Sequence, residues 1–242
     1  MTIIPSGHKS IDTLLGGGFR SGFITDIFGD SKLARNTISL LACIAAARRF
    51  CDSVVIYIDI RGNFRPELML EHLGDSSDSK KILNNIIVVR LDSDILLKST
   101  IRKALAHRPK MIVIDNFVTL FTNEFNGITR HLSVMHNLRH LAVTALNYDL
   151  AIIITNPSVY QKTDYYSNKK ANLKSISDGP YMIFKKEVLG STLGIYTDIV
   201  LQIERSQIEK SIYYVRLVKP HKQGRYHMRI INGRLEEMEG AG

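Results

Sequence analysis

The sequence of 242 residues holds 45% hydrophobic and 23% charged residues, which is typical of a folded globular protein rather than a disordered one. This length suffices for one well-buried core, and we expect residues 1–242 to form a single domain. The apolar runs are strand-sized, far below the roughly 20 residues of a membrane span, and the N-terminus does not read as a signal peptide. Cys43 and Cys51 lack the spacing of a zinc site or a disulfide framework. We therefore expect a cytoplasmic, nucleoid-associated protein, or a nuclear one in a eukaryote, without a membrane partner.

The net charge of +9 is unevenly distributed along the chain. Residues 161–234 hold 14 Lys and Arg against six Asp and Glu, whereas the other 168 residues hold 18 against 17. A basic C-terminal third on a nearly neutral body indicates either a surface that faces a polyanion or a solvated, solubilising face. Charge alone leaves these two interpretations open.

Apolar, β-branched runs alternate with segments of helical period over the first 156 residues. The runs predict strands at Phe23–Phe28, Ser53–Asp59, Ile86–Leu91, Met111–Asp115 and Leu150–Asn156. Helices are expected between them at Arg35–Phe50, Pro66–Leu73, Ser93–His107 and Arg130–Tyr148, with a surface loop at Gly74–Ser79. Near-continuous apolar strands separated by helices predict an α/β fold in which helices cover both faces of a mostly parallel sheet.

The pattern changes after a polar stretch at 157–189. Three close-spaced strands without intervening helices are expected at Asp198–Glu204, Ser211–Val218 and Arg225–Ile231. They predict an antiparallel extension of the same central sheet.

The segment Ser6–Gly29 reads SGHKSIDTLLGGGFRSGFITDIFG and resembles the start of the core in the RecA-like recombinases of archaea and eukaryotes, the RadA and RadB group. In that family the pattern TGxxxLDxLLGGGxxxGxxTEIxGxxGxGKT leads into the phosphate loop. In this chain the pattern contains a glycine turn, Gly16–Gly18, which can adopt positive φ. The turn leads into the strand that ends at Gly29.

Four further segments are similar to this family in the same order, so that the resemblance covers nearly the whole chain. They are Tyr57–Pro66, Met111–Asp115 with the residues after it, Asn147–Asn156 and Leu189–Gly194. The resemblance implies a RecA-like nucleotide-binding core. The length suggests a core-only, RadB-like paralogue without the family's N-terminal DNA-binding domain or its Phe-x-x-Ala polymerisation strand.

The phosphate loop departs from the family pattern GxxxxGK[ST], in which backbone N–H groups surround the phosphates, Lys contacts the outer ones and the hydroxyl holds magnesium. Gly29–Asn36 occupies these eight positions, with Ala34, Arg35 and Asn36 in place of Gly, Lys and Ser/Thr. A shift by one residue brings Thr37 to the hydroxyl position but Asp30 to the first glycine. Arg is a poor substitute for a phosphate-binding Lys because its side chain is larger and forked.

Two further family residues are replaced. Arg61 stands where the resemblance places the Glu that positions the attacking water, and Pro157 stands where it places the nucleotide-sensing Gln. Asp115 matches the magnesium-binding Asp, although a structural carboxylate at a strand end is the alternative. We therefore expect no catalytic residue and no resident metal, and we regard binding of ATP and magnesium as doubtful.

The resemblance also implies two DNA-binding loops. The first matches Phe121–Arg130, where Arg130 is followed by His131 and Arg139 as substitutes for an absent Arg. The second spans about 157–189, and its candidate DNA contacts are Lys162, Lys169, Lys170, Lys174, Lys185, Lys186, Tyr165 and Tyr166. Cations follow a phosphate backbone, and aromatic rings stack on unpaired bases. A lysine-rich loop whose tyrosines pack locally is the alternative.

Three functions agree with these features. The first is an accessory protein of recombination and DNA repair, which binds single-stranded DNA and a full-length RadA-type recombinase with little or no ATP hydrolysis. The second is a weak DNA-dependent ATPase. The third is an interaction scaffold that does not bind DNA. All three remain open because the fold alone does not determine the function.

Overall fold

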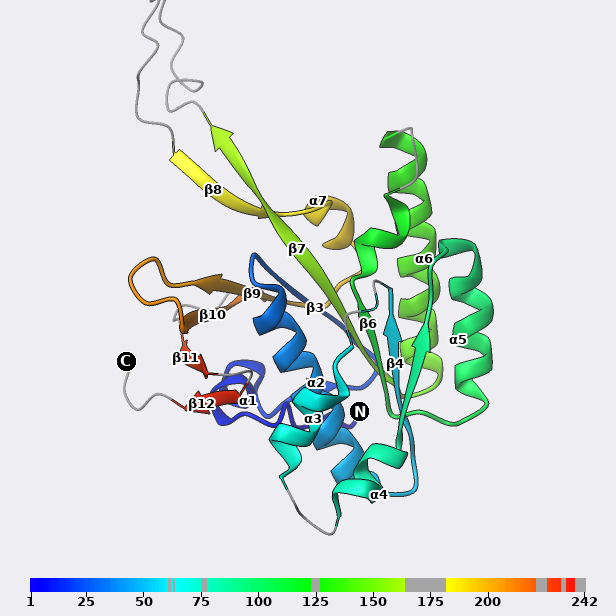
Figure 1. The fold of residues 1–242 in the computed structure, drawn as a ribbon. Helices are drawn as coiled ribbons and strands as arrows, with labels where there is room; N and C mark the ends of the chain where they lie inside the picture. The colour runs from blue at the N-terminus through cyan, green and yellow to red at the C-terminus, as the bar shows by residue number, and fades with distance from the viewer. Residues whose placement is uncertain are drawn as a thin grey trace, which may run out of the picture.

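A ten-stranded sheet forms the centre of the molecule in the computed structural model (Figure 1). The structure describes residues 1–60, 62, 64–74, 78–122, 127–163, 182–220, 226–231 and 234–237, without the side chains of 159–163, 182–186 and 237. The strand order is β12-β11-β10-β9-β3-β7-β6-β4-β5, and β8 pairs with β7. Five parallel strands form the first half of the sheet: β3 (Ile24–Gly29), β4 (Val55–Asp59), β5 (Ile86–Arg90), β6 (Met111–Asp115) and β7 (Ala151–Thr163).

Helices cover both faces of this parallel sheet, as the alternating pattern predicts. One face is covered by α2 (Lys32–Arg49), α3 (Pro66–Leu73) and α4 (Ser79–Asn84), and α1 (Lys9–Leu15) lies on the C-terminal strands beside them. The other face packs against α5 (Leu97–Leu105) and α6 (Gly127–Asn147). The result is two hydrophobic cores, one on either side of strands whose residues are almost all buried.

The predicted antiparallel extension is confirmed for β10 (Ile212–Lys219) and β11 (Tyr226–Ile231), which follow β9 (Ile199–Arg205) in antiparallel order. Strand β9, expected as the first strand of this extension, instead pairs in parallel with β3 and is a sixth parallel strand. A further short strand, β12 (Arg234–Glu237), ends the sheet and was missed by the sequence reasoning. The fold is therefore the expected α/β arrangement with antiparallel C-terminal strands.

The stretch 157–189, expected as a loop, instead has strands at its two ends, and these strands pair as a β-hairpin. Strand β7 continues to Thr163 and β8 (Met182–Glu187) returns antiparallel to it, with Ser158 opposite Glu187. The prediction was wrong at both ends because polar residues on a projecting hairpin do not show the apolar run of a buried strand. In Figure 1, β8 and the far part of β7 project past α2 and β9, away from the rest of the sheet.

Short elements complete the described chain: β1 (Ile3–Ile4), β2 (Phe19–Arg20), the 3-10 helices η1 (Asp94–Leu96) and η2 (Phe117–Phe121), and α7 (Gly190–Leu193). The loop predicted at Gly74–Ser79 ends sooner, because Ser79 is buried and begins α4; residues 75–77 lie outside the description. Gly18 adopts a φ of 136°, and a Cβ there would lie 2.2 Å from the carbonyl oxygen of Ile4, so the turn requires glycine. Within the described part of the chain, no helix is long and apolar enough to span a bilayer.

Candidate functional site

The loop between β3 and α2 carries the segment that resembles a phosphate loop. Gly29 ends β3 so close to β9 that a Cβ would lie 2.2 Å from the carbonyl oxygen of Ile203. Ser31 is the N-cap of α2 and its hydroxyl accepts a hydrogen bond from the backbone N–H of Ala34 at 3.2 Å. One of the free N–H groups of the first helical turn is thereby satisfied by the protein itself.

Arg35 folds back into this loop. Its side chain is only 4% exposed, and Nη1 donates a hydrogen bond to the carbonyl oxygen of Gly29. Burial lowers the pKa of Arg35, opposed by the charges of Asp115, Asp30 and Asp26, yet a guanidinium stays protonated in proteins. Its Nε is buried without a hydrogen-bond partner. The cation at the position of the phosphate-binding Lys is thus directed at the protein's own backbone.

Asp115, at the end of β6, accepts hydrogen bonds from neighbouring side chains at both carboxylate oxygens. Its Oδ1 accepts a hydrogen bond from the Thr155 hydroxyl, and its Oδ2 lies 3.1 Å from the Tyr57 hydroxyl. The same hydroxyl lies 3.2 Å from Oδ1 of Asn36 on α2. Burial raises the pKa of Tyr57 well above its usual range, and the charge of Asp115 adds to the effect. The geometry therefore fits the second interpretation of Asp115, a satisfied carboxylate at a strand end.

This donor set does not fit a magnesium–triphosphate held in the usual way. Magnesium needs a hydroxyl and a carboxylate free to reach it, directly or through water. Asn36 brings an amide oxygen that accepts a hydrogen bond from Tyr57, and each oxygen of Asp115 already accepts one hydrogen bond from the protein. Thr37, the hydroxyl one position later, is completely buried. Arg61, which stands where the family has Glu, lies outside the described residues.

A second polar cluster adjoins the first and was missed by the sequence reasoning. Asn156, on β7, donates from Nδ2 to Oδ1 of Asp26 at 2.9 Å and to Oε1 of Glu187 at 3.5 Å. Burial raises the pKa of Asp26, and burial together with the charge of Asp26 raises the pKa of Glu187 to about 11. The available signal was the carboxylate of Asp26, the one charged residue within a completely buried strand.

Some of the candidate DNA contacts of the second loop lie on β7 and β8, and the others lie outside the described residues. Lys162 is on β7 opposite Ile183, while Lys185 and Lys186 are on β8 opposite Tyr160 and Val159. The rest of that set, Lys169, Lys170, Lys174, Tyr165 and Tyr166, lies outside the described residues. The hairpin thus brings three of the predicted cations onto two paired strands.

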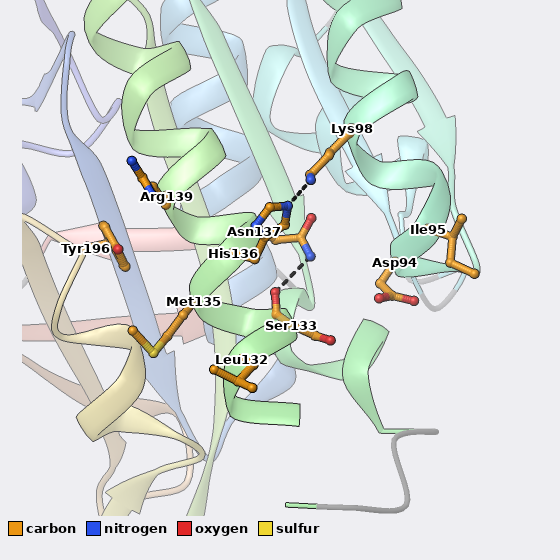
Figure 2. A pocket seen from close by; sticks show the side chains of 10 residues that line it. All are labelled: Asp94, Ile95, Lys98, Leu132, Ser133, Met135, His136, Asn137, Arg139 and Tyr196. Carbon is orange, nitrogen blue, oxygen red and sulfur yellow. Dashed lines mark hydrogen bonds between the residues drawn. The ribbon is translucent and has the colours of Figure 1, made fainter. Parts of the chain in front are cut away.

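The residues expected to supplement the first loop lie on α6 and do not form one group. Arg130 is half-buried near the start of the helix, and the ring of His131 contacts the Thr192 hydroxyl on α7. Arg139 lines a groove of about 610 Å³ that separates α6 from η1 and α5. In Figure 2, Lys98 reaches across this groove from α5 to the ring of His136, while Ile95 and Leu132 stand at its edges.

Comparison with known proteins agrees with this arrangement. The family model described as Rad51 matches residues 1–183. The chain belongs to the Rad51 family. This assignment confirms the RecA/RadA/RadB resemblance and the fold expected from it.

Curated relatives in this family are distant in sequence. The chain is similar to the DNA repair and recombination protein RadB of Archaeoglobus fulgidus, at 27% identity over 162 residues, 64% of this chain and 70% of the relative. It is also similar to the DNA repair and recombination protein RadA of Metallosphaera sedula (28%, covering 68% of this chain and 55% of the relative) and to the DNA repair protein RAD51 of Saccharomyces cerevisiae (28%, covering 65% and 43%). The matched region thus spans about half of the latter two proteins.

Proposed function

We propose that this Rad51-family chain is an accessory protein of homologous recombination and DNA repair. In this proposal residues 1–242 form one RecA-like core that binds DNA and a partner recombinase while hydrolysing little or no ATP. Relatives whose names refer to DNA repair and recombination support the pathway. The geometry of the loop between β3 and α2 supports the loss of hydrolysis.

The observation that carries the proposal is the buried contact of Arg35 with the carbonyl of Gly29. A phosphate-binding cation must face an incoming anion, and moving a buried guanidinium out of its site costs the contacts that it makes there. Asp115 supports the same conclusion, because its two oxygens accept hydrogen bonds from Thr155 and Tyr57. A group so engaged is poorly prepared to organise a metal ion.

The β7–β8 hairpin is the proposed DNA contact. Its two strands carry Lys162, Lys185 and Lys186, and the connecting residues 164–181 hold further lysines and tyrosines. This composition suits sequence-independent contact with the phosphates and bases of single-stranded DNA.

Two features at the β5 end of the molecule suit a protein partner. Among the described strands β5 pairs only with β4, and its Val88 side chain is 41% exposed. Ile95 and Leu96, in the adjacent η1, are 83% and 49% exposed. An open strand edge beside exposed apolar side chains is suited to receive a strand from another protein, as a recombinase partner would supply.

Titration with a fluorescent ATP analogue, with and without single-stranded DNA, tests the proposal when DNA binding and ATP hydrolysis are measured alongside it. We expect the protein to bind DNA in the absence of nucleotide, and to hydrolyse no ATP with or without DNA. DNA-stimulated hydrolysis would favour the weak ATPase instead. Absence of DNA binding, combined with co-purification of a recombinase, would favour the scaffold.

A further inference from the structure

The base of the β7–β8 hairpin is joined to β3 through buried carboxyl groups. Asn156 holds the junction, because its amide nitrogen donates to Asp26 and Glu187 while its Oδ1 accepts the backbone N–H of Val118 at 3.0 Å. Asp26 is in the middle of β3, and Glu187 is the last residue of β8. Three strands and η2 therefore meet at one amide side chain.

The Glu187 side chain is enclosed at this junction. It is 9% exposed, and a Cβ on Gly190 of α7 would lie 3.0 Å from its Oε2, so the turn after the hairpin leaves room for this carboxyl only because residue 190 is glycine. Beside Glu187, Asp26 is completely buried, and its Oδ2 is buried without a hydrogen-bond partner that carries a fixed proton. Two carboxyl groups so close in a buried site cannot both be ionised.

We propose that Glu187 is a positioning residue that fixes the base of the β7–β8 hairpin to β3 by donating the proton of its neutral carboxyl group to Asp26. The hydrogen bond runs from Glu187 to Asp26 Oδ2, and Asn156 aligns both groups. No bond is made or broken beyond this shared proton. The inference rests on the proposed function only in so far as the hairpin contacts DNA.

The charged groups that face this pair define its chemical setting. Arg35 of α2 is the cation that acts on Asp26, whereas β7 contributes the neutral Asn156 and α7 contributes Gly190. Arg35 also bonds to Gly29 at the end of the same strand. A continuous path thus leads from α2 through Asp26 and Glu187 to the hairpin.

Hydrogen exchange of the β8 amides in the whole chain, without DNA or nucleotide, tests the role of Glu187. In Glu187→Ala we expect exchange to accelerate roughly 5- to 100-fold, because Asp26 Oδ2 loses its donor. Glu187→Gln keeps a donor and should restore slow exchange. Gly190→Ala should accelerate exchange by displacing the Glu187 carboxyl. Glu204→Gln, a half-buried carboxyl on β9, is the matched control and should leave the β8 amides unchanged.

Measuring β8 exchange over a range of pH distinguishes a hydrogen bond that needs the proton of Glu187 from packing of the side chain alone. After correction for the intrinsic rate, opening of β8 in the parent should increase between pH 7 and pH 10, and it should stay constant in Glu187→Gln. A flat profile in the parent, or β8 exchange in Glu187→Ala equal to that in the parent, would overturn the inference. Loosened β8 amides with unchanged DNA affinity would support the inference and contradict the hairpin's role in DNA binding.

Discussion

The Nη1 of Arg35 donates a hydrogen bond to the carbonyl oxygen of Gly29, so that the first turn of α2 is tied to the end of β3. The two residues occupy the first and seventh positions of a segment that, in the family pattern, surrounds a triphosphate. Since the cation is bound within the protein, the loop has an internal counter-ion for the carboxylates around it.

The first prediction concerns hydrolysis. Purified protein should release no phosphate from ATP above background, because the positions of the outer-phosphate cation and the magnesium hydroxyl hold Arg35 and Asn36. Arg35→Lys alone should not create activity, since Asn36 and Arg61 remain. Phosphate release stimulated by DNA and abolished by Asp115→Ala would contradict this prediction.

The second prediction concerns stability. Arg35→Met should lower the free energy of unfolding in urea by about 2–4 kcal/mol, because the carboxylates near the guanidinium lose their buried cation. Lys32→Met, which removes an exposed cation from the same helical turn, is the control and should change stability by less than about 0.5 kcal/mol. An Arg35→Met variant as stable as the parent would show that the free-energy cost of burying the guanidinium equals the stabilisation from its contacts.

The third prediction concerns the tyrosine between α2 and β6. Tyr57→Phe should destabilise the protein by about 1–3 kcal/mol, because the buried oxygens of Asp115 and Asn36 lose a shared donor. Tyr148→Phe, at an exposed position, is the matched control and should be nearly neutral in the same urea titration. Equal midpoints for the two variants would mean that another donor replaces the hydroxyl.

The fold could be predicted from the sequence because the patterns that define its strands and helices are local. Met111–Asp115 and Pro66–Leu73 were predicted with their observed bounds, since apolar runs and helical period depend on neighbouring residues only. The pairing of Asp26 with Glu187 joins residues 161 positions apart and depends on packing that no local pattern encodes. For the same reason, replacement of the phosphate-loop Lys was visible in the sequence, whereas the contact of Arg35 with Gly29 was not.

The fourth prediction concerns the pH dependence of stability. The pKa of Glu187 rises from 4.5 to about 11 on folding, so the folded chain holds more protons than the unfolded chain between these values. This contribution to stability is complete below pH 4.5 and declines as pH rises, by at most about 1.4 kcal/mol per unit. In urea titrations from pH 6 to pH 9, the parent should therefore lose more stability than Glu187→Gln. Parallel curves for the two proteins would show that the carboxyl is ionised in the folded state.

The last prediction concerns DNA. If the net charge of +8 on residues 161–234 serves a phosphate backbone, binding should be independent of sequence, prefer single strands and weaken steeply with salt. Four to six phosphate contacts give a slope of roughly −3 to −4 in a plot of log affinity against log salt concentration. Replacing Lys169, Lys170 and Lys174 together with Ala should make the slope shallower by about 2, since each contact on single strands contributes about 0.7.

Substitution of Tyr165 and Tyr166 provides the contrasting arm of this experiment. Loss of stacking should reduce the free energy of binding by about 1–3 kcal/mol per base and leave the salt slope nearly unchanged, because no phosphate contact is removed. Fluorescence anisotropy with a labelled single strand at several salt concentrations measures both quantities. A flat salt response, or a lysine triple variant equal to the parent, would mean that the basic segment faces solvent or a protein partner rather than DNA.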